Sequence, residues 1–406
     1  MRFISKIRKI DKRWAFAVAA MLISIAAILT SGHFGQQDET NLTYAQYTQS
    51  RYNIVKTRVI TTDDSRLSPD PYIENMRLGV QPITLEILSG PYEGEVHSIN
   101  NTMSRAYNID LKPGMDFLSI VHEEDGILQG IDVYGYSRDT VIYWLIAVFC
   151  LTVVVIGHKK GLYSLISLAF TLVLIIFFLI PRIIEGYNPI LMAIITAALT
   201  TAATIFIVAG TGPKSCSAII GVVLGVAIAG LTAVIAGTIG NISGINAQES
   251  SEIVGLSQDA PIKVRELFFA GIIIAALGAV LDIGMSISSS IFEIKQADPT
   301  LGMRELYKKG MNIGRDIIGT MTNTLILAFA GSSMAILIII TMYRLPYLRL
   351  INLDIVGLEI IQGVAGSIGL TLTVPITALS AACLAARKTK QKPKLNAPSS
   401  QNRSPS

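Results

Sequence analysis

The most constraining feature of the sequence is a series of apolar blocks, each about 20 residues long, which is the length a helix needs to cross a hydrocarbon layer of ~30 Å. Hydrophobic residues make up 51% of the 406-residue chain and charged residues only 15%. Soluble proteins have about a quarter of their residues charged. The chain is therefore expected to be a mainly α membrane protein, with a bundle of about eight transmembrane helices.

The first apolar block, residues 14–30, follows a run of basic residues between Arg2 and Arg13. This order is typical of a signal sequence, and since no small-x-small cleavage site follows Thr30, a signal anchor is favoured over a cleaved signal peptide. In either case the following segment is exported. Seven further spans are expected, at residues 140–157, 162–180, 190–210, 217–240, 267–291, 317–342 and 364–386.

The distribution of Lys and Arg predicts the orientation, because cytoplasmic loops carry an excess of both. With the N-terminus inside, every inner segment is net basic, and the segment 387–406 adds five cations at its start. The longest outer loop carries four acidic residues against two basic ones. Both termini are therefore expected in the cytoplasm and residues 33–139 outside it.

Four regions follow from these patterns. Residues 1–32 form a basic segment and the anchor helix, and residues 140–386 form a seven-helix transmembrane domain. Residues 33–139 are acidic, lack cysteine and alternate apolar with polar residues, for example at 83–87, which predicts a small exported β-rich domain. The stretch 36–70 has no clear pattern and is interpreted as partly linker. Residues 387–406 are rich in Lys, Pro and Ser and are expected to be a disordered basic tail.

Signatures of soluble enzymes are absent from the sequence, which has no phosphate-binding Gly-rich loop, no His-Glu-x-x-His and no Gly-x-Ser-x-Gly. His97 and His122 lie near acidic residues, but their spacing fits no metal-ligand pattern. Cys150, Cys216 and Cys383 lie in or beside apolar blocks and are interpreted as packing residues. No catalytic residue, metal, cofactor or nucleic-acid partner is expected, and the chain is not expected to be an enzyme.

A carboxylate lies deep inside the block 267–291. Asp282 would cost at least about 2.5–3.5 kcal/mol to insert there, so such a residue usually faces the bundle interior, a partner or water. Ser286 and Ser289 follow four and seven residues later and share its helical face. The block is therefore expected to have one polar side.

The next block, 317–342, has a matching polar stripe. Arg315 and Asp316 precede the block at the inner surface, and Thr320 and Asn323 follow Asp316 at helical spacing. Counted from the inner loop, Asp282 is about 16 Å deep and Asn323 about 12 Å deep. The two stripes are expected to meet, either as a lumen or substrate pocket or as a hydrogen-bond network that locks two helices.

Small residues mark close helix packing in two of the blocks. Gly221 and Gly225 form a small-xxx-small pattern, and Gly278 belongs to a second group of small residues. Packing within the chain is favoured over a dimer motif, because an eight-helix bundle has many internal interfaces.

Several of these segments resemble the YibE/F-like family of bacterial membrane proteins. The resemblance is carried by Gly278-Ala279-Val280-Leu281-Asp282, by the run from Gly310 to Met321, by Asn323 to Ala328, and by the late Gly366-Ser367-Ile368-Gly369 and Val374 to Ala378. It implies a multi-pass protein of the bacterial inner membrane. The family is described as permeases on the basis of topology, so the resemblance supplies no mechanism.

The leading hypothesis is a permease of a small solute or ion, with a polar pathway between the sixth and seventh spans and Asp282 as the responsive group. The alternative is a membrane scaffold or sensor that does not transport and whose exported domain binds an envelope partner. An intramembrane enzyme is the third hypothesis, because catalysis would need a second acid, or a nucleophile and a base, at one depth, and the sequence offers a single acid. The expected partners are the lipid bilayer, an unidentified small solute or ion, and either further copies of the chain or an envelope protein.

Overall fold

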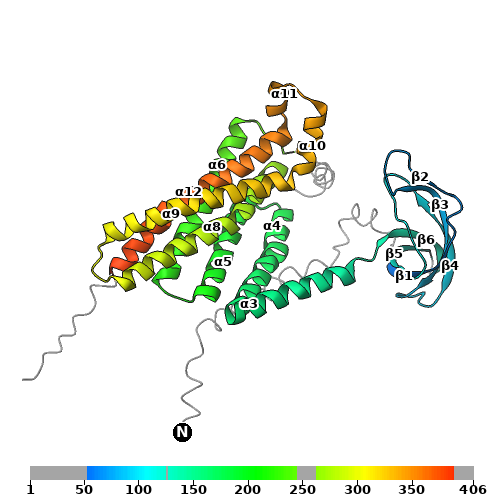
Figure 1. Ribbon diagram of the computed structural model, residues 1–406, viewed down its shortest axis with the longest axis horizontal. Coiled ribbons are helices and arrows are strands. Elements are labelled where there is room, and N and C mark those ends of the chain that lie inside the picture. The colour runs from blue at the N-terminus through cyan, green and yellow to red at the C-terminus, as the bar shows by residue number, and fades with distance from the viewer. Residues whose placement is uncertain (1–52, 125–126, 245–261, 388–406) are drawn as a thin grey trace, which may run out of the picture. The chain divides into compact units, whose positions relative to one another are not determined.

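The computed structural model describes residues 53–124, 127–244 and 262–387, and the chain divides after Val155 into two compact units. The first unit holds an antiparallel sheet, and the second is a bundle of helices (Figure 1). The expected first span, 14–30, and almost all of the expected tail, 388–406, lie outside the described residues.

The first unit contains a six-stranded, fully antiparallel half-barrel. Its strands follow the order β2-β3-β1-β5-β6, with β4 on the other edge of β3. The strands are β1 (Asn53–Thr62), β2 (Leu67–Pro69), β3 (Arg77–Ile87), β4 (Val96–Met103), β5 (Asp116–Glu124) and β6 (Ile127–Tyr136). The expected β pattern is confirmed at β3 to β6. The long strand β1, in contrast, begins inside the stretch that was interpreted as partly linker.

The core of this half-barrel is formed because apolar and polar side chains alternate along the strands. Val55 and Val59 on β1, Leu85 on β3, and Phe117 and Val121 on β5 are at most 3% exposed. Strand residues two apart point to the same face, so these side chains collect on the concave side. The unit therefore has a hydrophobic core of its own.

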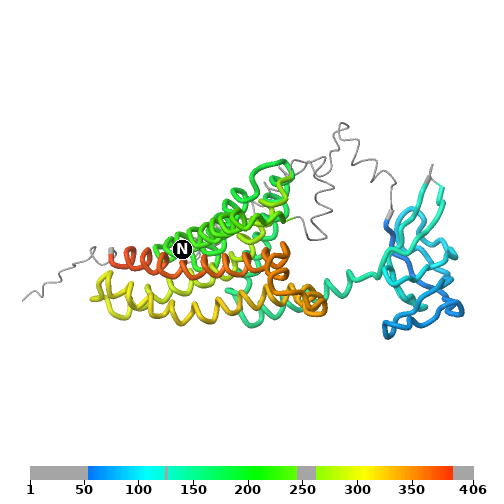
Figure 2. Tube along the Cα trace, turned by 90° about the horizontal axis from the view of Figure 1, so that it is seen from above, coloured from blue at the N-terminus to red at the C-terminus, as the bar shows by residue number. Residues whose placement is uncertain are grey.

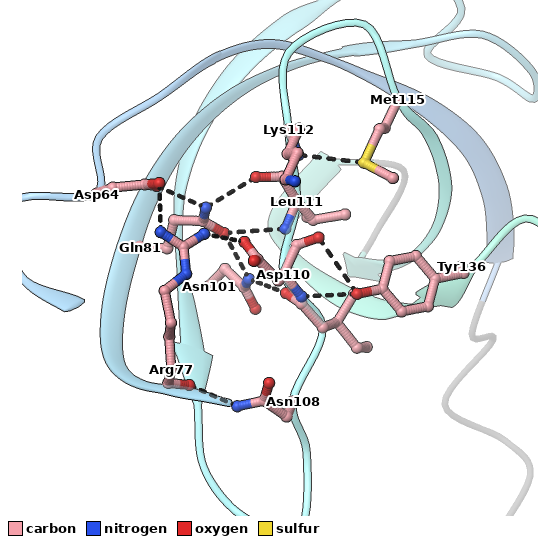
Figure 3. Close-up of polar contacts among 11 residues, drawn as sticks. Asp64, Arg77, Gln81, Asn101, Asn108, Asp110, Leu111, Lys112, Met115 and Tyr136 are labelled. Atoms are coloured by element: carbon pink, nitrogen blue, oxygen red, sulfur yellow. Dashed lines mark hydrogen bonds and ion pairs between the residues drawn. The ribbon is translucent and has the colours of Figure 1, made fainter. Parts of the chain in front are cut away.

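One end of this core is closed by a buried amide, Gln81, on β3 (Figure 3). Its Nε2 donates to Oδ1 of Asp64 and to the carbonyl of Leu111, each at 2.8 Å. Its Oε1 accepts from Nδ2 of Asn101 at 3.1 Å and from the N–H of Leu111 at 3.3 Å. All four hydrogen-bonding positions of the amide are thus filled, which fixes the segment between β4 and β5 against the barrel.

Ion pairs reinforce the same end of the half-barrel. Arg77 pairs with Asp64 at 2.6 Å and also with Asp110 (Figure 3). Hydrogen bonds from Gln81 and Arg77 hold the pKa of the Asp64 carboxyl below its usual value. Nearby, the Asp70 side chain is fully buried and accepts from Arg105 at 2.6 Å, and this contact lowers the pKa of Asp70 in the same way. Both carboxylates stabilise the fold in their ionised form.

The second unit and the segment leading into it are helical. A 46-residue helical stretch runs from α3 (Asp139–Leu174) through a π-helical turn, η3 (Ile175–Leu179), into α4 (Ile180–Ile184). It is interrupted at His158, whose φ of 46° and ψ of −130° are not helical. At 1.5 Å per residue the stretch is about 69 Å long, more than twice the hydrocarbon thickness. The break lies between the two spans expected at 140–157 and 162–180.

The remaining long helices correspond to the other expected spans. They are α5 (Pro189–Ala209), α6 (Pro213–Ile239), α8 (Val264–Ala297), α9 (Met303–Ser332), α10 (Met334–Tyr343) and α12 (Asp354–Arg387), with the short α11 (Tyr347–Ile351) before the last. The span expected at 317–342 is a bent pair, because α9 and α10 meet at 66°. The described residues thus contain five helices long and apolar enough to cross a membrane, or six if this pair is one span. The total of eight remains a prediction.

Helix α12 is the central element of the bundle. It packs against α6, α8 and α9, and in Figure 2 its orange-to-red tube runs alongside the yellow α9. Leu370, Val374 and Ala378 of α12 are completely buried. Between α6 and α8, the hydroxyls of Ser217 and Ser288 lie 2.7 Å apart, and Ser288 also donates to the carbonyl of Lys214. These contacts fix α8 against the rest of the bundle.

We predict that residues 33–139, expressed alone, give a strand-dominated circular dichroism spectrum and are destabilised by acid. The folded-state pKa values of Asp64 and Asp70 lie below the unfolded value of about 3.9. Their contribution is therefore fully present above about pH 5 and is lost as the pH falls through the folded values. The urea midpoint should be equal at pH 7 and pH 5 and lower at pH 3.

Asp64→Asn serves as the control, since it removes one titrating group and should reduce the loss between pH 5 and pH 3. A helical spectrum, or a midpoint that is the same at pH 3 and pH 7, would contradict the prediction.

Candidate functional site

One face of α8 is made only of small and polar residues. The residues exposed there share one helical face and are Gly271, Ala275, Gly278, Asp282, Ser286 and Glu293. Ser289 lies on the same face and is partly exposed. The described part of α5, α6 and α12 exposes large apolar side chains such as Leu191, Leu224 and Leu372, whereas α8 exposes none. The α8 face therefore lacks the side chains that normally contact lipid.

Helix α9 has a matching polar face over its first two-thirds. Its exposed residues from the third turn onward include Asn312, Arg315, Asp316, Gly319, Thr320 and Asn323. After Met303 at the start of the helix, the next exposed large apolar side chain of α9 is Ile326. The helix starts at Met303, earlier than expected, so Arg315 and Asp316 lie well inside it rather than at its beginning. We call the exposed residues of the two helices together the α8–α9 polar face.

Two close contacts fix the register of these antiparallel helices. A Cβ on Gly310 would lie 2.5 Å from Cδ1 of Ile291, and a Cβ on Gly314 would lie 3.4 Å from Cδ1 of Ile287. Ile291 is therefore level with Gly310, and Ile287 with Gly314.

Counting from these contacts places the polar residues at matched depths. Asp282 is level with Gly319 and adjacent to Thr320 in depth, and Gly278 is level with Asn323. Ser286 is level with Arg315, and Ser289 with Asn312. The two polar stripes therefore overlap in depth, but Asn323 lies about four residues deeper than Asp282, whereas the count from the inner loop had placed it shallower.

Within the described residues, however, the site residues make few contacts with one another across the two helices. Asp282 has no hydrogen bond or ion pair there, and Arg315 donates instead to Oδ1 of Asn312 at 3.2 Å. Thr320 donates to the carbonyl of Ile317, one turn earlier in its own helix. Asp282 and Arg315 form no ion pair in this part of the chain, and Asp282 is not among the residues that line the three cavities of about 360, 340 and 260 Å³ there.

The three glycines expected at helix contacts have different surroundings. A Cβ on Gly221 would lie 1.8 Å from Oγ1 of Thr377, and a Cβ on Gly225 would lie 1.8 Å from Oγ1 of Thr373. Both glycines therefore allow α6 and α12 to approach closely within one chain. No heavy atom lies within 4 Å of a Cβ built on Gly278, which belongs to the α8–α9 polar face.

A second acid in an apolar setting was missed by sequence analysis. Glu359 lies on α12 and, with residues such as Phe329, Ser333, Leu337 and Ile360, lines a groove of about 360 Å³ between α9, α10 and α12. The expected span began at residue 364, so Glu359 was assigned to a loop, whereas α12 begins at Asp354. Glu359 lies one helical turn before Gly363 and Val364, and this spacing could have indicated that it belongs to the same helix. Across the described ranges, no group of three or more His, Cys, Asp or Glu side chains could hold a metal ion.

Comparison with known proteins identifies one family. The model of the family described as YibE/F-like protein matches residues 145–387, which is more than half of the chain and includes both helices of the polar face. Neither the curated proteins nor the solved structures contain a match.

We predict that Gly225→Ala destabilises the bundle. The added methyl group would overlap Thr373 and would lie 3.1 Å from the carbonyl oxygen of Gly369, so α6 and α12 would have to separate. Overpacking of this kind costs about 1–3 kcal/mol. The measurement is thermal or denaturant unfolding of the purified protein in detergent.

Gly331→Ala is the matched control, because no heavy atom lies within 4 Å of a Cβ built there. Its stability should be unchanged or slightly raised, since Ala favours helix more than Gly does. Equal losses for the two variants would argue against a close α6–α12 contact.

Proposed function

Because the chain belongs to the YibE/F-like family, whose match includes the α8–α9 polar face, we propose that it is a membrane permease for a small solute or ion. The observation that carries the proposal is a continuous polar face on α8 and α9, about four helical turns long from Gly278 to Glu293. Within a bilayer such a face is costly unless it contacts protein or water. The solute pathway would run along it.

Asp282 is the group that would respond to protons or cations along this pathway. It is the one acid of α8 between Glu266 and Glu293, and it is surrounded on its face by Gly278 and Ser286. Small side chains leave room for water or a solute next to the carboxylate. The hydroxyls and amides of Ser289, Thr320 and Asn323 can exchange hydrogen bonds with a passing solute at low cost.

A membrane scaffold or sensor is the second candidate, and a specific observation favours it. The polar face opens to the outside of the described helices rather than into a cavity between them. A face with this position also suits binding of another membrane helix. In this case the β-rich unit would bind a cell-envelope partner. In a permease the same unit would gate the pathway, recruit a partner or act as a sensor.

The proposed setting is the bacterial inner membrane, with eight spans, both termini in the cytoplasm and residues 33–139 on the opposite side. The hairpin between α8 and α9 supports this orientation. It carries Lys295, Arg304, Lys308 and Lys309 within or next to the helix ends. Cytoplasmic ends are enriched in such residues.

We predict that Asp282→Asn abolishes solute-coupled proton movement while the protein remains folded. The amide keeps the shape of the side chain but cannot bind or release a proton. The test uses proteoliposomes that enclose a pH-sensitive dye, with a panel of ions and small solutes added outside. The wild-type protein should give a pH change with at least one solute, and the variant should give none.

The control is Glu185→Gln, which removes a carboxylate from the α4–α5 connection, where Glu185 pairs with Arg182 at 2.8 Å. This variant should transport like the wild-type protein. A fully active Asp282→Asn variant would contradict the permease mechanism, and a thermally destabilised one would point to a structural role.

The topology gives a separate prediction. In cells, a membrane-impermeant thiol reagent added outside should label a cysteine introduced at Glu93 in the half-barrel and should not label one at Lys308 in the α8–α9 hairpin. The three native cysteines are first replaced, because Cys216 is exposed in the described residues. Labelling at Lys308 without labelling at Glu93 would reverse the orientation.

A further inference from the structure

We propose that a second copy of the chain covers the α8–α9 polar face, with α9 of one copy packed against α8 of the other. The proposal concerns the same face as the proposed pathway, but it holds whether or not the face conducts a solute. Three observations carry it, namely the composition of the face, the charge of its two halves and their matched depths.

The composition of the face indicates a protein partner. Lipid-facing surfaces elsewhere in the described bundle carry Leu and Ile, whereas α8 presents Gly271, Ala275 and Gly278 above Asp282. Small residues at these spacings let two helix backbones approach closely, which is how helices associate in a bilayer without a hydrophobic driving force. A carboxylate in the middle of such a stripe needs a donor or a cation from the partner.

The remaining apolar segments of the chain do not supply that partner. Residues 14–30 and residues 140–157 are long enough to cross a membrane, but neither contains a charged residue. Neither segment can therefore supply a cation to Asp282. Arg315 on α9, in contrast, lies about four residues from Asp282 in depth, a displacement of about 6 Å that an arginine side chain can span.

The charges of the two helices are complementary. Between Arg265 and Lys295, α8 carries Glu266, Asp282 and Glu293 and no cation. In the first turn of α9 the exposed charges of Arg304 and Glu305 cancel each other. Beyond that turn the exposed face carries three basic residues, Lys308, Lys309 and Arg315, and one acidic residue, Asp316. The face therefore has an acidic half and a basic half.

A two-fold axis along the membrane normal brings residues of equal depth together. Packing α8 on α8 would place Asp282 beside its own copy, and packing α9 on α9 would place Arg315 beside its own copy. Packing α8 on α9 of the other copy instead places Glu293 level with Lys308 and Gly278 level with Asn323. Charge thus selects the α8-to-α9 arrangement, which repeats twice in a closed dimer.

The test uses two copies of the full-length chain with different tags, co-expressed after replacement of Cys150, Cys216 and Cys383. One copy carries Gly278→Cys and the other carries Asn323→Cys. A short thiol-specific cross-linker applied to native membranes should join the two tags. A second pair, Ser289→Cys with Asn312→Cys, should do the same, so the result does not depend on one substitution.

The control pair is Leu224→Cys on α6 with Leu372→Cys on α12, both exposed on apolar surface of the described bundle. This pair should not join the two tags. Cross-linking of Gly278→Cys to itself without cross-linking to Asn323→Cys, or absence of cross-linking at both polar-face pairs, would overturn the proposal.

Substitutions that exchange the charges of Glu293 and Lys308 distinguish a contact between two copies from a contact within one copy. With Glu293→Lys in one copy and Lys308→Glu in the other, both intermolecular contacts keep opposite charges, and cross-linking at 289–312 should stay at the wild-type level. With both changes in the same copy and a wild-type partner, both contacts become repulsive, and cross-linking should fall by roughly two- to fivefold, as for exposed ion pairs. The reverse pattern would show that the pair forms within one chain and would overturn the proposal.

Discussion

The structure of the helical unit depends on one constraint, namely that a bilayer offers no hydrogen-bonding partner to polar groups within it. Several of the polar side chains in the described spans obey it by donating to the preceding turn of their own helix. Thr196, Thr232, Ser367 and Thr373 each donate to the carbonyl four residues earlier. Ser217 and Ser288 instead form a hydrogen bond with each other across the α6–α8 contact. Asp282 cannot obey the constraint in this way, since a carboxylate cannot donate to a carbonyl when ionised.

Close backbone approach is the second consequence of the same constraint. Lipid is as apolar as the helices, so helices associate through packing and short polar contacts rather than through removal of apolar surface from water. The α6–α12 contact shows how this works, because Gly221 and Gly225 receive the side chains of Thr377 and Thr373. Gly369 brings the two backbones together, with its Cβ position only 2.6 Å from the carbonyl oxygen of Gly225. The result is a tight pair around which α8 and α9 are arranged.

Much of this organisation could be predicted from the sequence, because hydropathy and alternation are local properties. The helices α5, α6, α8 and α12 and the strands β3 to β6 each have a clear pattern. Strand β1 was missed, since its pattern of buried Val55, Thr57 and Val59 includes a threonine whose hydroxyl is satisfied by Ser119 on β5, a partner distant in the sequence. The start of α9 was placed too late because Lys308, Lys309 and Arg315 lower its hydropathy. For the candidate site, helical spacing predicted the two polar stripes, but the count from the inner loop placed Asn323 too shallow, because α9 begins at Met303. It could not predict that both would open outward, which depends on how each helix packs against α12.

That outward position connects the two functional candidates. A single copy offers half of a polar pathway, with its other side open to lipid, so a permease with this site would be incomplete alone. A partner helix that supplies cations within reach of Asp282 and level with Glu293 would close the pathway and would also be the contact that a scaffold requires. If the partner is a second copy, α8 of each copy lies against α9 of the other, so each Asp282 faces the helix that carries Arg315 rather than the other Asp282. The same contact of an acidic with a basic helix face would then close the pathway and hold the two copies together, so one arrangement satisfies both the permease and the scaffold.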